Sequence, residues 1–124
     1  MAGSKTILFV EDDRPISEMY ARLLIKAGFE VDFAYDGLEA LAKSATKSYD
    51  LILLDIMMPG KSGIEVLHEL RKNPGFNATR IIILTNLAQD KTSQEAIRSQ
   101  ADGYLVKADI IPSQLMAVVK EILS

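Results

Sequence analysis

The sequence has no cysteine and no long apolar run, although 48% of its 124 residues are hydrophobic. The lack of cysteine excludes disulfides and thiolate metal sites. No run approaches the ~18 apolar residues of a membrane span, and no signal peptide precedes the first apolar run. We therefore expect a cytoplasmic domain without membrane contact. Residues 1–4 resemble a cloning remnant, which leaves 5–124 for a single domain.

Concentrated positive charge is also missing. Lysine and arginine together number 14 against 17 acidic residues, giving a formal net charge of -3, with both signs interspersed along the chain. Because binding to nucleic acid phosphates requires a concentrated basic surface, this balance argues against direct nucleic acid binding by the domain. The apolar content is high enough to fill one core without covalent cross-links.

Apolar runs alternate five times with amphipathic segments. The runs at 7–10, 51–54 and 81–84 are continuous and aliphatic or branched, as in strands that are buried on both faces. Residues 31–35 alternate between apolar and small or acidic side chains, which predicts a half-exposed edge strand. A fifth, shorter strand is predicted at 104–106.

The segments between these strands have helical spacing. Apolar residues recur every three or four positions in four stretches, which are 16–27, 38–45, 64–70 and 111–122. Pro15 suits a first helical turn, and Gly28 suits the position just past a helix end. The segment 89–100 has only Ala96 and Ile97 as apolar residues, so we expect it to pack thinly and to open at lower cost than its neighbours.

Five successive strand–helix units predict an α/β fold with a parallel sheet covered by helices on both faces. The ligand site of such a sheet lies beyond the carboxyl ends of the strands, where the strand order reverses. The segment 73–79 is predicted to be a surface connection.

Polar residues follow the buried strands at this predicted edge. They are Glu11, Asp12 and Asp13 after the first strand, Asp55 after the third, Thr85 after the fourth and Lys107 after the fifth. Clustered carboxylates repel one another unless a cation binds, and an oxygen-only ligand set favours Mg²⁺. A divalent ion neutralises an incoming phosphoryl group, while lysine and threonine contact its oxygens. The set therefore predicts phosphoryl chemistry at Asp55.

Each of these residues also has an ordinary structural interpretation. Asp13 lies just before Pro15 and could act only as a helix cap. Threonine is common at strand ends, and a single lysine such as Lys107 is often only solvated. These interpretations would have to hold on four segments at once, so phosphoryl chemistry explains the pattern better. His68 lies on a polar helix face and is expected to be exposed.

The sequence resembles the receiver domain of two-component response regulators. The matching stretches are 7–13, 54–60 with Gly63, 84–85 and 103–107, in the family's order and spacing. The resemblance implies a flavodoxin-like, doubly wound, five-stranded parallel sheet of order 2-1-3-4-5. It also implies a phosphoprotein of a phosphorelay, which catalyses only its own phosphorylation and dephosphorylation and is otherwise not an enzyme.

The resemblance assigns roles to single residues. Asp55 takes the phosphoryl group from a histidine kinase or phosphotransfer protein, and Mg²⁺ is the cofactor. The implied metal ligands are Glu11, Asp12, Asp55 and the backbone carbonyl of Met57. Thr85 and Lys107 contact the phosphoryl group. Thr85 and Tyr104 couple the site to the surface of the fourth helix, fifth strand and fifth helix. That surface signals to an output domain or another protein, and the family also allows homodimers. Tyr104 could instead be an ordinary half-buried strand tyrosine.

Two positions depart from the family pattern. Ala108 stands where the family usually has proline after the lysine, and Asn86 stands where it prefers a small residue after the threonine. The change at Ala108 bears on the placement of Lys107, and both changes bear on the rate of phosphotransfer and the lifetime of the phosphoryl group. Asp13 falls one place beyond the family's acidic pair.

Two other functions would use similar residues. A phosphatase of the haloacid-dehalogenase type also forms an aspartyl phosphate, but it places a second aspartate two residues after the nucleophile, where this chain has Met57. An interaction module that keeps the fold without phosphotransfer normally loses the aspartate, threonine or lysine. This chain retains all three of these residues.

Overall fold

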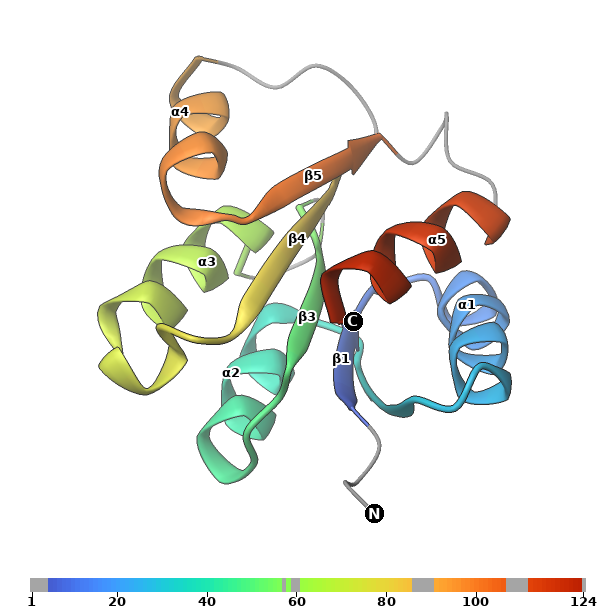
Figure 1. Cartoon of the computed structure of the whole chain (residues 1–124). Coiled ribbons are helices and arrows are strands. Elements are labelled where there is room, and N and C mark those ends of the chain that lie inside the picture. Colours follow the sequence, from blue (N-terminus) through green and yellow to red (C-terminus); the bar gives the residue numbers. More distant parts are fainter. Residues whose placement is uncertain (1–4, 57, 59–60, 86–90, 107–111, 124) are drawn as a thin grey trace.

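Five parallel strands form one sheet in the order β2-β1-β3-β4-β5 in the computed structural model (Figure 1). The structure describes residues 5–56, 58, 61–85, 91–106 and 112–123, so the segment 1–4 lies outside it. The strands are β1 (Thr6–Val10), β2 (Glu30–Ala34), β3 (Leu51–Asp55), β4 (Arg80–Thr85) and β5 (Gly103–Val106). This strand order confirms the predicted flavodoxin-like fold class.

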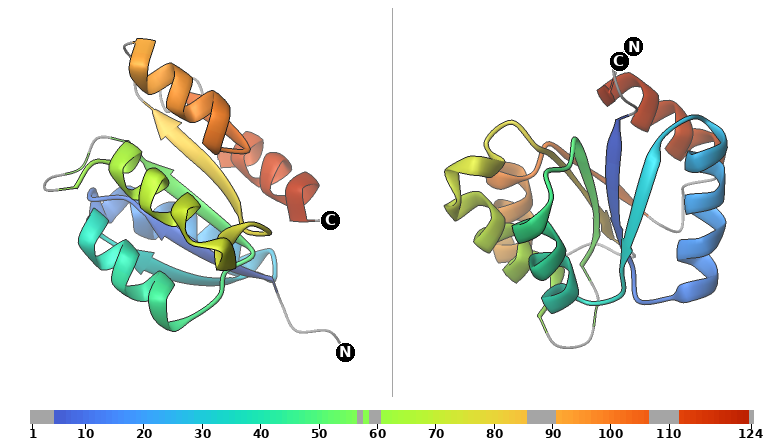
Figure 2. Two further views of the ribbon diagram at one scale, coloured as in Figure 1. Left: turned by 90° about the vertical axis from the view of Figure 1, so that its left-hand side faces the viewer. Right: turned by 90° about the horizontal axis from the view of Figure 1, so that it is seen from below.

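Helices cover both faces of the sheet. They are α1 (Arg14–Lys26), α2 (Gly37–Thr46), α3 (Gly63–Lys72), α4 (Lys91–Gln100) and α5 (Pro112–Leu123). Helices α1 and α5 lie on one face, and α2, α3 and α4 lie on the other (Figures 1 and 2). Within the described part of the chain, every helix is too short or too polar to cross a lipid bilayer.

Local sequence signals account for the helix ends. The Asp13 carboxylate accepts a hydrogen bond from the Ile16 amide at 3.1 Å and caps α1. Past the end of α1, Gly28 adopts a positive φ of 103°, which a residue with a Cβ rarely adopts. At the start of α3, Ser62 and Glu65 form a reciprocal capping box, each accepting from the other's amide at 3.3 Å.

Alternation along the strands divides the core into two apolar clusters, one on each face of the sheet. Residues 8, 10, 52, 54, 81 and 83 pack with α3 and with Ile97 of α4, whereas 7, 9, 51, 53, 82 and 84 pack with α1 and α5. All five residues of β3 are buried, as predicted for a central strand. Strand β2 is mostly half-buried, as predicted for an edge. The central strands are thereby held from both sides, which fixes the position of their carboxyl ends.

The segment 73–79 is not a simple surface connection. It contains a short 3-10 turn, η1 (Pro74–Phe76), and the Phe76 side chain joins the core. The Thr79 hydroxyl is buried and donates to the Tyr49 carbonyl at 3.1 Å. The prediction missed the burial of Phe76, because the rest of this segment is mostly polar. The Phe76 side chain holds the segment against the core.

Candidate functional site

Three carboxylates meet at the carboxyl ends of β1 and β3. Glu11 and Asp12 directly follow β1, and Asp55 is the last residue of β3. The two strands are neighbours with Val10 paired to Leu54, so the next residues of each strand lie side by side. One carboxylate oxygen from each of Glu11, Asp12 and Asp55 lies within 4.8 Å of the others. The predicted convergence is therefore found for these three residues.

Burial differs among the three side chains. Glu11 and Asp55 are each only 1% exposed, whereas Asp12 is open to solvent. The backbone around them is fixed by the sheet, because the Glu11 amide donates to the Ala34 carbonyl at 3.0 Å and the Ile56 amide donates to the Leu84 carbonyl at 3.1 Å. These three carboxylates thus lie on backbone that the sheet holds in place, and one of them faces solvent. We call the set of Glu11, Asp12 and Asp55 the acidic recess.

Gly63 brings the start of α3 against the backbone of this site. A Cβ at this position would lie 2.3 Å from the Asp55 carbonyl oxygen and 2.7 Å from the Ile56 Cα. The Gly63 amide also donates to the Ile56 carbonyl at 3.0 Å. Glycine is needed here for close approach of two backbone segments. Sequence reasoning used Gly63 only as part of a family motif and missed this role.

The donor set fits a hard divalent cation. All three described groups are carboxylates, which Mg²⁺ prefers over nitrogen or sulfur ligands. Mg²⁺ keeps several water ligands, and Asp12 gives the set a member in contact with solvent. Mutual repulsion of three nearby anions also favours binding of a cation between them.

The remaining predicted site residues are placed differently. Asp13 caps α1 and is not among the three carboxylates of the recess. Thr85 ends β4, where its backbone pairs with Val106 of β5 at the same edge of the sheet. Tyr104 lies on β5 with 61% of its surface exposed, so it is more exposed than a half-buried strand tyrosine, and its coupling role stays a prediction. Four predicted residues lie outside the described part of the chain, namely Met57, Asn86, Lys107 and Ala108.

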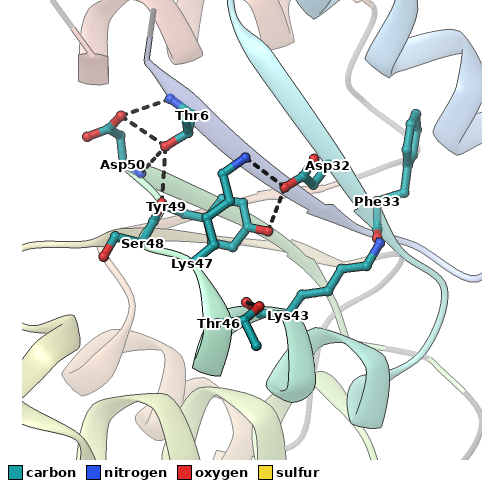
Figure 3. A network of polar contacts seen from close by, with 9 residues as sticks. All are labelled: Thr6, Asp32, Phe33, Lys43, Thr46, Lys47, Ser48, Tyr49 and Asp50. Atoms are coloured by element: carbon teal, nitrogen blue, oxygen red, sulfur yellow. Dashed lines mark hydrogen bonds and ion pairs between the residues drawn. The ribbon is translucent and has the colours of Figure 1, made fainter. Parts of the chain in front are cut away.

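A second polar cluster, which sequence reasoning missed, lies away from the acidic recess (Figure 3). We call it the amino-end network and define it as Thr6, Asp32, Lys47, Tyr49 and Asp50. Asp50, just before β3, accepts hydrogen bonds from the Thr6 amide at 2.8 Å and the Thr6 hydroxyl at 3.2 Å. Asp32 accepts from the Tyr49 hydroxyl at 2.7 Å and from the Lys47 ammonium at 3.1 Å. Each carboxylate of this network therefore has two donors.

Hydrogen bonding in this network shifts two pKa values in opposite directions. The hydrogen bond from Tyr49 lowers the pKa of Asp32, partial burial opposes this shift, and the Lys47 ammonium adds to the lowering. Burial, together with the neighbouring carboxylate, raises the pKa of Tyr49 far above its usual value. Both shifts favour the ionised carboxylate beside a protonated hydroxyl and ammonium.

Several curated proteins are similar to this chain in sequence. The chain is 41% identical over 82% of its length to the regulatory protein VanRB of Enterococcus faecalis. It is 37% identical over 94% of its length to the transcriptional regulatory protein ResD of Bacillus subtilis. These matches cover 44% and 47% of the two relatives, so the chain spans about half the length of the curated relatives it matches.

Solved structures match over nearly the whole chain. The Vibrio cholerae chemotaxis protein CheY4 aligns with a TM-score of 0.87 and 32% identity, covering 97% of this chain and 99% of that one. The Thermotoga maritima response regulator TrrA, solved in complex with Mg²⁺–BeF, aligns with a TM-score of 0.80 and 39% identity, covering 95% and 98%. A sequence model of the response regulator receiver domain matches residues 7–120. The chain therefore belongs to the family of response regulator receiver domains.

Proposed function

We propose that this receiver domain accepts a phosphoryl group on Asp55 in a reaction that depends on Mg²⁺. The observation that carries the proposal is the approach of the Glu11, Asp12 and Asp55 carboxylates to within 4.8 Å at the strand ends. A buried nucleophilic carboxylate beside two further acids is suited to phosphoryl transfer only when a cation offsets the charge.

The proposed reaction transfers one phosphoryl group without net change in oxidation state. A carboxylate oxygen of Asp55 attacks the phosphorus of a phosphohistidine, the P–N bond breaks, and the imidazole leaves with the bonding electrons. The product is an acyl phosphate on Asp55. Glu11, Asp12, Asp55 and the Met57 carbonyl would hold Mg²⁺, which when bound neutralises charge on the transferred group. Thr85 and Lys107 would contact the phosphoryl oxygens.

The wider role follows from the family. We propose a cytoplasmic histidine kinase or phosphotransfer protein as the donor. Phosphorylation would shift the surface formed by α4, β5 and α5 through Thr85 and Tyr104, and that surface would contact an output domain, another protein or a second copy of the chain. The relatives about twice this length include transcriptional regulatory proteins, which supports an output of that kind. The structure with Mg²⁺–BeF of a 39% identical regulator supports the choice of metal.

The test is incubation with Mg²⁺ and acetyl phosphate, followed by intact-mass measurement. We expect the mass gain of one phosphoryl group in the wild type and in Asp13→Asn, and no gain in Asp55→Asn. A gain that persists undiminished in Asp55→Asn would overturn the assignment of the acceptor. No gain in any protein, together with no saturable Mg²⁺ effect on the amides near Asp12 and Asp55, would favour an interaction module without phosphotransfer.

A further inference from the structure

Arg71, near the end of α3, joins three separate segments of the chain. Its Nε donates to the Gln100 carbonyl at 2.7 Å, at the last residue of α4. Its Nη1 donates to the carbonyls of Phe76 and Thr79 at 2.7 and 3.1 Å, on either side of the turn that leads into β4. Its Nη2 donates to the Asp102 carboxylate at 3.0 Å. The Arg71 side chain is only 17% exposed, which strengthens these charged hydrogen bonds.

Asp102 fixes the turn between α4 and β5 to the start of β4. Its amide donates to the Ile81 carbonyl at 2.8 Å, and its carboxylate accepts from the Ile81 amide at 2.7 Å. Arg80 reaches the other carboxylate oxygen at 3.4 Å but is 59% exposed, so its contribution is small. We call the paired side chains of Arg71 and Asp102 the Arg71–Asp102 clamp.

The apolar attachment of α4 lies in the same half of the helix as the clamp. Of the α4 side chains that the structure describes, Ile97 is the buried one, and Ala101 just beyond the helix packs against the same cluster. Gln94 and Glu95, earlier in the helix, are exposed. Figure 1 shows that the chain leaves α4 on the side of α3 and turns there into β5. Arg98 and Ser99 in the carboxyl half are exposed as well, so the apolar anchors described for α4 are Ile97 and the adjoining Ala101, both close to the clamp.

We propose that the Arg71–Asp102 clamp makes the carboxyl end of α4 a fixed pivot. When α4 responds to phosphorylation, the helix rotates about Gln100, and its amino end moves most. The trigger rests on the proposed function, but the pivot is a property of the unphosphorylated fold as well. A ten-residue helix is about 15 Å long, so a rotation of about 10° displaces the far end by about 2–3 Å while the clamp stays closed. That far end follows β4 and Thr85 in the chain.

Amide hydrogen exchange in the unphosphorylated protein tests the pivot directly. We expect slower exchange at residues 97–103 than at 93–96. Arg71→Gln should accelerate exchange at 97–103 by about tenfold or more, because charged hydrogen bonds to the helix end are lost. Arg80→Gln is the control, because it also removes an arginine charge beside the Asp102 carboxylate. It should change exchange at 97–103 by less than about threefold.

A second variant tests the clamp independently in case Arg71→Gln does not fold. Asp102→Asn keeps an oxygen for the Ile81 amide but removes the negative partner of Arg71, so it should accelerate exchange at 97–103 more than Arg80→Gln does. If neither Arg71→Gln nor Asp102→Asn accelerates exchange at 97–103 more than Arg80→Gln, the clamp does not hold the helix end and the proposal is overturned.

Phosphorylation with acetyl phosphate and Mg²⁺ tests the direction of movement. Amide chemical-shift changes should be largest at the amino end of α4 and fall toward Gln100, and this gradient should flatten in Arg71→Gln. Equal changes along α4, or the largest changes at its carboxyl end, would overturn the pivot. If Asp55 takes no phosphoryl group, the proposed function fails separately, and hydrogen exchange alone decides the pivot.

Discussion

The acidic recess and the amino-end network group their carboxylates differently. In the recess, three carboxylates lie within 4.8 Å of one another, and two of them are almost fully buried. In the amino-end network, Asp50 and Asp32 each accept hydrogen bonds from two donors, among them a lysine ammonium. The network therefore links strands through side-chain hydrogen bonds, whereas the recess gathers carboxylates in an arrangement that suits a divalent cation.

Gly63→Ala should have the largest effect, because it disturbs the backbone of the recess itself. The added Cβ would lie 2.3 Å from the Asp55 carbonyl oxygen, so α3 or the end of β3 must shift. We expect a loss of about 3 kcal/mol in the free energy of unfolding, measured with urea, together with slower phosphorylation of Asp55. Gly75→Ala is the control and should cost less than about 1 kcal/mol, because its nearest neighbour is the Asn73 side chain at 3.2 Å. Equal losses in the two variants would contradict the close-approach argument.

Asp50→Ala should weaken the amino-end network. It removes the acceptor of both the Thr6 amide and the Thr6 hydroxyl at the start of β1. We expect a loss of about 2 kcal/mol in unfolding free energy with little change in Mg²⁺ affinity, since the recess is at the other end of the strands. Asp50→Asn keeps an acceptor oxygen and should lose clearly less. A comparable loss of Mg²⁺ affinity would show that the two ends are not independent.

Asp55→Asn should act in the opposite direction on stability. Neutralising one of three crowded carboxylates relieves repulsion, so without divalent ions we expect a gain of about 1 kcal/mol in unfolding free energy. If the recess holds Mg²⁺ as proposed, the ion would bind only the folded state, so Mg²⁺ should stabilise the wild type and have little effect on this variant. Thermal unfolding with and without Mg²⁺ measures both effects, and Asp13→Asn is the control. A variant less stable than the wild type without Mg²⁺ would argue against repulsion in the recess.

Asp32→Asn should show the smallest effect, visible as a pH dependence. Because hydrogen bonding lowers the pKa of Asp32 in the folded state, its stabilisation is present above the unfolded-state value of about 3.9. It is lost as the pH falls through the lower folded-state pKa. The side chain is 38% exposed, so we expect less than about 1 kcal/mol. The difference in stability between variant and wild type, followed by urea titration, should be present at pH 7 and shrink below pH 4. A difference that grows in acid would reverse the assigned sign.

Periodicity and strand-end chemistry were sufficient to predict most of the fold and part of the recess. The buried strands, the helix stop at Gly28 and the approach of Asp55 to Glu11 all depend on local pattern plus parallel topology. Contacts between distant side chains were not predictable. Arg71 and Asp102 are 31 residues apart, and nothing in the spacing of either residue marks them as partners. The burial of Phe76 was missed for the same reason, since a single apolar residue in a polar segment has no period.

Two side chains of α2 form hydrogen bonds with outward-facing backbone groups at the β2 edge of the sheet. Strand β2 is an edge strand, and its outward row of backbone groups would otherwise be a template for pairing with another chain. Lys43 of α2 donates to the Phe33 carbonyl, and Glu39, one helical turn earlier, accepts from the Tyr35 amide at 2.6 Å. Lys43 and Glu39 thus bind one backbone carbonyl and one backbone amide along the β2 edge of the sheet. The Phe33 carbonyl and the Tyr35 amide are thereby occupied within the domain and less available for pairing with the strand of another chain.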